Sequence, residues 1–373
     1  MPAPPYTLRF DPNLSLNADG DDVRDGLSAA VITGNNLWIC CDERTTIERL
    51  RRTGPRSFGK HCSYKLADLI DLPDKATEEV DLEGMGEAEN YLWVLGSHSI
   101  KRKNAKPEDP NIAKQIGRLA KIEIAPNRCL LARIPLVHNA KTGDYELLKS
   151  APHPTAPDQK LRAAQLRSDA KGTNELLQVL AKDEHIGPML KVPAKDNGFD
   201  IEGLAASPDG RLFLGLRGPV LHGWAIVLEI RPEDHKKGQL RLGQVEGGKH
   251  KLYKKHFLDL RGMGIREIRQ QGTDLYILAG PTMDLDGTIA VYRWREALFQ
   301  AHDSLTPADQ LERLFDVPHL PHLDRAEGMA LLSEQEMLVI FDKPAPKRKP
   351  RPHVALANTF PVPPVSAAAP SEG

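Results

Sequence analysis

The chain has 373 residues, with 50 Lys and Arg against 51 Asp and Glu, which gives a formal net charge of -1. Hydrophobic residues make up 40% of the chain and charged residues 27%, so a folded core is expected and wholesale disorder is excluded. The balanced charge excludes a global electrostatic attraction to nucleic acid or to an anionic membrane. Because the sequence shows neither a long apolar run nor a signal peptide at its start, we expect a cytoplasmic protein with no membrane partner.

Five segments of the chain repeat one pattern, in which a short turn separates two apolar runs. The second run begins 9 or 10 residues after a key position, and the turns are rich in Gly, Asn and Asp, so each segment is predicted to be a β-hairpin. The key positions are separated by 55, 119, 64 and 61 residues. In chain order they are Ser28, Glu83, Glu202, Arg266 and Glu327.

Further strand-like runs follow the hairpins. A third run and then a fourth are found at residues 46–50 and 64–66, 119–124 and 129–134, 224–230 and 256–260, and a third run at 288–292. Four antiparallel strands in each repeat, arranged radially, are typical of a β-propeller. We therefore expect an all-β protein with five blades. Six blades are the alternative, because the gap of 119 residues has room for one more.

We explain the long gap by an insertion. Residues 150–195 lose the alternating pattern and contain helix-forming residues at 174–180, so a mostly helical insertion is predicted there. The run at residues 6–10 is expected to pair with the last blade, which closes the ring and leaves no exposed sheet edge. Residues 1–360 are thus predicted to form one propeller domain. Residues 361–373, rich in Pro, Ala and Ser, are predicted to be a disordered tail.

Charged residues gather where the first two strands of each repeat meet. Antiparallel pairing places the start of the first strand beside the end of the second, at one mouth of the central channel. The key positions are therefore expected to lie near Asp42, Glu43, His98, Arg217 and Asp342. Crowded carboxylates raise one another's pKa unless a cation neutralises them, and oxygen ligands suit calcium or magnesium. The metal ligands predicted on this basis are Glu83, Glu202, Glu327, Asp42 and Asp342.

The arginines at the same mouth suit an anionic group. Arg217 and Arg266 have the bidentate geometry that phosphate and carboxylate require, and His98 is the candidate for proton transfer. The alternative interpretation is a structural network, in which the carboxylates pair with these arginines and hold the blades together. The differences at Ser28 and Arg266 favour a functional site, because a purely architectural device has less reason to vary between blades.

Two basic loops are predicted to lie at this mouth. One contains Lys101, Arg102 and Lys103, and the other spans residues 343–351. Clustered cations there would attract an anionic small molecule or an acidic protein surface. A nucleic-acid partner is not expected, because the loops lack the interleaved aromatic residues on which bases stack.

Several motifs resemble a known family. They are Asn197–Leu204 (NGFDIEGL), Leu216–Pro219 (LRGP), Tyr91–Ser99 (YLWVLGSHS), Ile277–Pro281 (ILAGP) and Ala326–Met329 (AEGM). Together they resemble a bacterial family catalogued as a domain of unknown function. The resemblance implies a propeller-like fold over residues 20–345, and the family has no known activity to carry over.

A more distant similarity links Asp-Ile-Glu-Gly-Leu and the following Pro-Asp-Gly to phytase-like esterase propellers and, in the Glu-Gly start, to calcium-dependent lactonases. That resemblance implies metal ligation by Glu83, Glu202 and Glu327. The fourth repeat departs from it, because Arg266 stands at the key position with Glu267 beside it.

Two functions are compatible with these patterns. The first is a metal-dependent hydrolase, in which a divalent ion activates water against a phosphoester or a lactone. The second is a non-catalytic, protein-binding propeller scaffold with a structural Glu/Arg network at its channel mouth.

Overall fold

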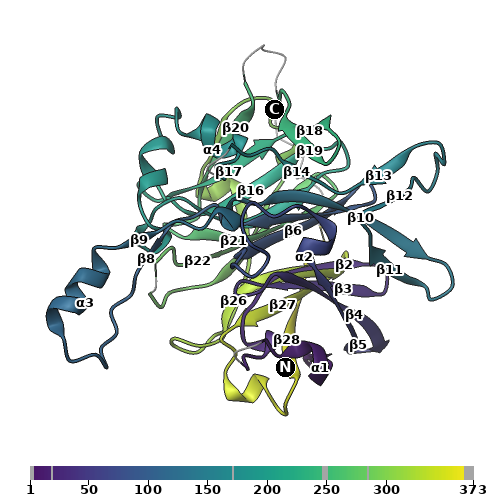
Figure 1. The fold of residues 1–373 in the computed structure, drawn as a ribbon, viewed down its shortest axis with the longest axis horizontal. Coiled ribbons are helices and arrows are strands. Elements are labelled where there is room, and N and C mark those ends of the chain that lie inside the picture. Colours follow the sequence, from purple (N-terminus) through teal and green to yellow (C-terminus); the bar gives the residue numbers. More distant parts are fainter. Residues whose placement is uncertain (1–3, 18–19, 170–171, 246–250, 284, 365–373) are drawn as a thin grey trace, which may run out of the picture.

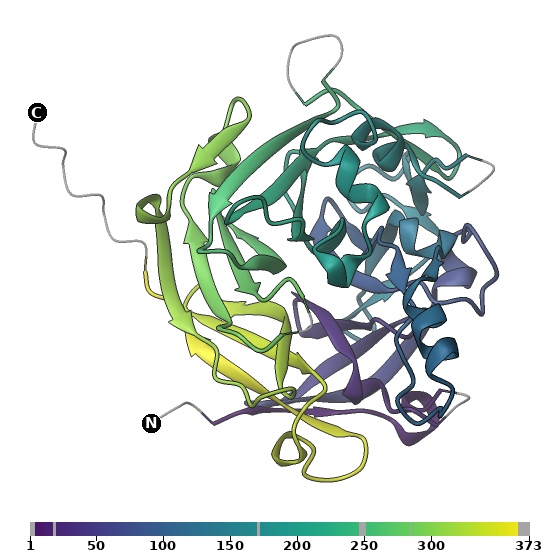
Figure 2. The same cartoon turned by 90° about the vertical axis from the view of Figure 1, so that its left-hand side faces the viewer.

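The computed structural model describes residues 4–17, 20–169, 172–245, 251–283 and 285–364. Within these residues the chain forms antiparallel sheets that follow one another around a centre, from purple through teal to yellow in Figure 2. The first strands of the repeats contact each other in a closed cycle, β2 to β6, β6 to β15, β15 to β21, β21 to β26 and β26 to β2. The chain is therefore a β-propeller, as the repeat predicted.

Each sheet extends outward from its first strand. The first strands are β2 (Leu27–Thr33), β6 (Leu82–Ala88), β15 (Asp200–Ala206), β21 (Gly264–Gln271) and β26 (Arg325–Ser333). The second strands are β3 (Asn36–Cys41), β7 (Tyr91–Gly96), β16 (Leu212–Gly218), β22 (Asp274–Gly280) and β27 (Glu336–Asp342). The third strands are β4 (Thr46–Gly54), β10 (Leu131–Asn139), β17 (Trp224–Ile230), β23 (Ala290–Trp294) and β28 (Val354–Pro361). The outer strands are β5 (Ser57–Lys65), β14 (Ala164–Leu166), β20 (Tyr253–Asp259), β25 (Leu311–Asp316) and β1 (Tyr6–Arg9).

The two ends of the propeller meet at β1. This strand pairs antiparallel with β28, from Tyr6 opposite Ala357 to Arg9 opposite Val354. Its other edge pairs in parallel with β5, where Thr7 lies opposite Ser57. The first and last sheets thereby become one eight-stranded sheet, which leaves no free edge at the junction.

Every key position of the repeat is a β-bulge. In each first strand the pairing with the second strand skips the key residue, which is Ser28, Glu83, Glu202, Arg266 or Glu327. A bulge adds an unpaired residue to one strand and redirects its side chain. The register of the repeat is thus confirmed in all five units. Arg266, and not the neighbouring Glu267, is the residue equivalent to the glutamates.

The glycine after the bulge lets adjacent first strands approach closely. A Cβ atom on Gly203 would lie 2.9 Å from the backbone nitrogen of Ile268, and one on Gly328 would lie 3.0 Å from the Cα of Ala29. Real Cβ atoms rarely come this close to backbone. The Glu-Gly pair therefore combines a side chain directed at the channel mouth with the tight packing of the ring.

The second unit differs from the sequence-based prediction. The run 119–124 was expected to be its third strand, but it contains the end of α3 (Ile112–Leu119) and β9 (Ile122–Glu123), which pairs with β8 (Lys101–Arg102). The third strand is β10, at the position expected for the fourth. The pattern was misleading because an exposed amphipathic helix ends where the alternation of β9 begins.

The insertion at residues 150–195 contains both strands and helix. Helix α4 (Glu175–Leu180) lies where the sequence predicted one, and the Asn174 side chain caps it by accepting a hydrogen bond from the backbone of Leu177. The segment also contains β12 (Ser150–Pro152), β13 (Lys160–Arg162) and β14. Because β14 pairs with β10, the insertion completes the second sheet.

The remaining elements lie outside this plan. They are α1 (Pro12–Ser15), α2 (Leu66–Leu69), β11 (Asp144–Leu147), β18 (Pro232–Lys236), β19 (Gln239–Leu242) and β24 (Ser304–Thr306). Among the described residues, no helix has the length and apolar character needed to cross a membrane. Strand β28 ends at Pro361, the first residue of the predicted disordered tail, and residues 365–373 lie outside the described part.

Candidate functional site at the channel mouth

A cavity of about 660 Å³ lies at the channel mouth, where the first strands begin and the second strands end. Thirteen acidic and nine basic side chains line it, and none of its lining residues is aromatic. The lining includes Asp42, Glu43, Glu83, Glu202, Arg217, Glu327 and Asp342 from the predicted mouth set. The convergence of these residues is therefore as expected, and the acidic excess favours a cation over an anion as the first ligand.

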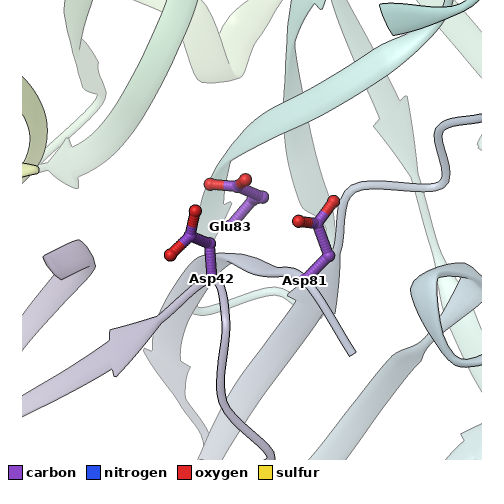
Figure 3. Close-up of side chains that lie close together, drawn as sticks. All are labelled: Asp42, Asp81 and Glu83. Atoms are coloured by element: carbon purple, nitrogen blue, oxygen red, sulfur yellow. The ribbon is translucent and has the colours of Figure 1, made fainter. Parts of the chain in front are cut away.

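Three carboxylates form a compact group in this cavity. Asp42 directly follows β3, Asp81 directly precedes β6, and Glu83 is the bulge residue of β6. One oxygen atom from each lies within 4.8 Å of the other two. Figure 3 shows the three carboxyl groups facing a common space. We call Asp42, Asp81 and Glu83 the acid cluster.

Burial and mutual repulsion control the protonation of the acid cluster. Burial raises the pKa of Glu83 well above its usual range, and the carboxylates of Asp81, Glu202, Glu327 and Asp42 raise it further. The pKa of Asp42 rises to about 7 through burial and through Glu327 and Asp81. Arg217 also acts electrostatically on Glu83, but burial and the carboxylates outweigh it, so at neutral pH the cluster holds protons or needs further positive charge.

One further carboxylate, Asp342, adjoins the cluster, and the pKa of the cluster member Asp81 is also raised. Burial raises the pKa of Asp342 to about 8, with contributions from Glu327 and Asp42 that Lys343 and Arg325 partly offset. Burial also raises the pKa of Asp81 to about 6, although Arg128 beside it acts in the opposite direction. The cavity thus contains several carboxyl groups that titrate near neutral pH.

Arginines neutralise the opposite side of the mouth. The guanidinium of Arg217 lies 2.5 Å from Asp200 and 2.5 Å from Glu202. Arg266 lies 2.8 Å from Glu327 and 3.7 Å from Glu202, and it donates a 2.9 Å hydrogen bond to the carbonyl of Pro281. We call Arg217, Arg266, Asp200, Glu202 and Glu327 the arginine network. Arg217 lines the cavity, whereas Arg266 is buried at 6% exposure and does not line it.

His98 lies away from the cavity lining, contrary to its expected place at the mouth. Its side chain is buried, and both ring nitrogens are engaged, Nδ1 with the carbonyl of Gly96 at 2.8 Å and Nε2 with the Asn174 amide at 2.6 Å. Burial lowers the pKa of His98 to about 4. A neutral ring whose Nδ1 donates and whose Nε2 accepts fits these partners, so His98 links β7 to the cap of α4.

The predicted basic residues do line the cavity, but acids neutralise them. Lys101 pairs with Glu79 at 2.6 Å, Arg102 with Asp196 at 2.8 Å and Lys103 with Glu123 at 2.7 Å. These pairs are largely exposed, which limits both their strength and their attraction for an outside anion. In the second basic loop, Lys349 pairs with Asp25 and Arg348 with Asp324.

Sequence reasoning missed Asp81, Asp200 and Arg128. The two aspartates occupy one place in two repeats, since each lies two residues before the key glutamate, as Asp81-Leu82-Glu83 and Asp200-Ile201-Glu202. This Asp-x-Glu pattern was the available signal. Arg128 comes from the connection before β10 and pairs with Asp81 at 2.9 Å and with Glu79 at 2.7 Å. Its sequence neighbourhood gave no indication of that role.

A second missed feature closes the channel behind the cavity. The guanidinium of Arg269, on β21, donates hydrogen bonds of 2.5 to 3.0 Å to carbonyls of all five first strands. The acceptors are Ala30, Met85, Leu204, Ile268 and Met329. Glu267 pairs with the same guanidinium at 2.5 Å. A ligand therefore enters and leaves the cavity through one mouth.

Known structures with a similar overall arrangement are distant in sequence. A PQQ-bound aldose sugar dehydrogenase from Streptomyces coelicolor is 9% identical, with 90% of this chain and 95% of that chain covered and a TM-score of 0.35. YCF48 bound to a D1 peptide is 11% identical, with 98% of each chain covered and a TM-score of 0.30. A putative glucose dehydrogenase from Thermus thermophilus is 14% identical, with 90% and 97% covered and a TM-score of 0.33.

The curated proteins contain no match to this sequence. A family model, by contrast, matches residues 26–358, which span all five bulges and every residue of the acid cluster and the arginine network. The chain belongs to the protein family of unknown function DUF3616.

Proposed function

We propose that the channel mouth binds one divalent cation, calcium or magnesium, through the acid cluster, and that the bound ion supports hydrolysis of a phosphoester or a lactone. The observation that carries the proposal is Glu83, a carboxyl group that forms no ion pair with any described residue and whose pKa is raised by burial and by four other carboxylates. A divalent ion supplies the missing charge.

The geometry of the acid cluster fits such an ion. Two oxygens bound at roughly 2.4 Å from one ion are at most about 4.8 Å apart, and the cluster oxygens satisfy this limit. Three carboxylates leave further coordination positions for water and substrate. A set of oxygen ligands without histidine or cysteine suits calcium or magnesium rather than zinc.

The chain's own residues would divide the chemistry between the two sides of the mouth. A carboxylate of the acid cluster takes a proton from a water molecule, and the oxygen of that water forms a bond to the phosphorus or carbonyl carbon. The bond to the alcohol oxygen then breaks, and that oxygen receives a proton from solvent. Arg217, which lines the cavity, stabilises the negative charge that develops. Arg266 is a positioning residue, because it contacts Glu327 and Glu202 from behind.

The non-catalytic scaffold remains the second candidate, and one observation favours it. Arg217 and Arg266 are already engaged with Asp200, Glu202 and Glu327, so the arginine network has a structural role with or without a ligand. The two candidates differ at the acid cluster, which the scaffold does not require to bind metal.

Glu83→Gln tests the proposal, with Glu87→Gln as the matched control. Both glutamates lie on β6, but Glu87 is at the opposite end of the strand, where it accepts a hydrogen bond from Thr33 that a glutamine can keep. We expect about one calcium or magnesium per wild-type chain by mass spectrometry, and a lower melting temperature after chelation. By calorimetry, Glu83→Gln should weaken calcium binding at least about tenfold and Glu87→Gln should not.

Phosphoester and lactone hydrolysis should fall with calcium binding in the Glu83→Gln protein. If the protein binds metal but neither the wild type nor any variant hydrolyses these substrates, the non-catalytic scaffold, stabilised by metal, is the remaining function. Wild-type protein that neither contains metal nor changes its melting temperature when metal is added would overturn the proposal.

A further inference from the structure

A basic hairpin projects from the propeller beside the channel mouth. It spans residues 101–124, begins with β8, contains α3 and ends with β9 and Ile124. In Figure 1 it extends from the body on the left. Its base is attached to the propeller by the pairs of Lys101 with Glu79 and of Arg102 with Asp196.

One face of α3 is apolar and has no packing partner. Ile112 is 71% exposed, Ile116 65% and Leu119 44%, and their spacing of four and three residues places them on one side of the helix. No residue of α3 is buried. With Ile122 and Ile124, the hairpin carries five of the fourteen large hydrophobic side chains that are exposed in the described part of the chain. Such concentration marks an interaction surface.

Positive charge accompanies this apolar face. Residues 101–124 contain seven Lys and Arg against three Asp and Glu, although the whole chain is nearly neutral. Four of the seven pair with acids, namely Lys101, Arg102, Lys103 and Lys114. Lys106, Arg118 and Lys121 form no ion pair with any described residue. The hairpin therefore presents an excess of four positive charges, seven cations against three anions, around aliphatic side chains.

A second copy of the chain does not suit this surface. Helix α3 has eight residues and is about 12 Å long, too short to bury the roughly 1,200 Å² of a stable interface by itself. Two such helices would also bring their lysines and arginines together. The binding partner must instead be an extended surface with negatively charged groups at its boundary and an apolar region beneath them.

We propose that the basic hairpin binds the surface of a lipid bilayer that contains anionic phospholipids. Short amphipathic helices with aliphatic residues on one face and Lys or Arg on the other lie in the plane of such surfaces. Each lysine or arginine near the headgroups adds attraction. The balanced charge of the whole chain had favoured no membrane partner, because the local excess on one hairpin is cancelled elsewhere in the sequence.

This binding would orient the propeller on the membrane. Lys101, Arg102, Lys103 and Leu119 belong both to the hairpin and to the cavity lining. A bilayer that holds α3 therefore lies beside the channel mouth. The inference does not depend on the metal site, since neither the apolar face nor the unpaired cations belong to the acid cluster.

Vesicle sedimentation with the full chain tests the proposal. Vesicles of phosphatidylcholine with a quarter phosphatidylserine should bind the protein at 0.1 M NaCl, and phosphatidylcholine alone should bind it weakly. The double variant Ile112→Ser/Ile116→Ser should lower the partition coefficient at least about tenfold, because it removes the two most exposed side chains of the helix face. Lys106→Glu/Lys121→Glu should abolish the preference for phosphatidylserine.

Phe299→Ser/Leu305→Ser is the matched control, since both residues are exposed apolar side chains outside the hairpin, at 68% and 59% exposure. It should bind vesicles as the wild type does. All of these variants should keep the wild-type melting temperature, because the substituted side chains are exposed. Absent or phosphatidylserine-independent binding by the wild type would overturn the proposal. Undiminished binding by the double isoleucine variant would overturn it as well, as would light scattering that shows a dimer formed through these isoleucines.

Discussion

The acid cluster and the arginine network lie at the same channel mouth and use the same backbone device, yet their charges are balanced differently. Glu83, Glu202 and Glu327 are all bulge residues at the start of a first strand. Glu202 and Glu327 have arginines within 2.5 and 2.8 Å, whereas Glu83 is surrounded by carboxylates. The bulge thus determines where a side chain lies, and an arginine on the paired second strand or on a neighbouring first strand determines whether its charge is neutralised.

The difference comes from two substitutions in the repeat. Arg217 lies near the end of β16, at the place that Asp42 occupies after β3 in the first unit. Arg266 is the bulge residue of β21, whereas three of the other units have glutamate at the bulge. On one side of the mouth the carboxylates therefore have arginine partners, although burial still raises the pKa of Glu202 to about 8. The other side requires protons or a cation, so functional sites on a repeat fold are best sought where the compensating charge is missing.

Arg217→Met removes a cation from the arginine network and should have the largest effect on stability. It removes the cation that lies 2.5 Å from both Asp200 and Glu202, which are 2% and 3% exposed, and leaves Glu202 with Arg266 at 3.7 Å. The free energy of unfolding in urea should fall by about 3–5 kcal/mol at pH 7. Arg241→Met, which removes an exposed pair with Glu233, is the control and should change it by less than about 1 kcal/mol. Equal effects of the two substitutions would mean that the arginine network does not stabilise the fold.

A change of pH tests the carboxyl groups Asp42 and Asp342, which form no ion pair with a described arginine. The folded-state pKa values of Asp42 and Asp342, about 7 and about 8, lie above the usual 3.8, so between these limits the folded chain holds protons that the unfolded chain has released. The stability that these groups contribute is then fully present below pH 4 and is lost progressively as pH rises through 7 and 8.

Thermal unfolding from pH 5 to pH 9 in the presence of a chelator measures this loss. Calcium should reduce it, because the ion replaces the protons. Stability that rises with pH in the chelator would contradict the assignment of Asp42 and Asp342 as proton-holding groups.

Lys103→Ala should have the smallest effect. Its pair with Glu123 is exposed on both sides, at 35% and 51%, so stability should change by less than about 1 kcal/mol. Calcium affinity should rise by no more than about twofold, since the change removes one screened positive charge from the cavity rim. A large loss of affinity would instead place the basic loop in the binding site.

The sequence predicted the site to different degrees in its two parts. All five bulge positions were found because each lies 9 or 10 residues before the next apolar run. Asp81 and Asp200 were not found, although both stand two residues before a key glutamate. His98 was placed at the mouth by the same geometry, but a left-handed residue (φ 57°) turns the chain there and buries the ring against Asn174.

By itself, the amino-acid sequence determined the propeller, the register of its repeats and the set of charges at one mouth, because alternation, turns and spacing are local properties of the chain. Tertiary structure alone decided which charges are neutralised. Arg269 contacts carbonyls of five strands, up to 239 residues away from it in the sequence, and Arg266 pairs with Glu202 and Glu327 of two other sheets. Such contacts depend on distances in space that no local pattern encodes, and they separate the balanced side of the mouth from the side that still needs a cation.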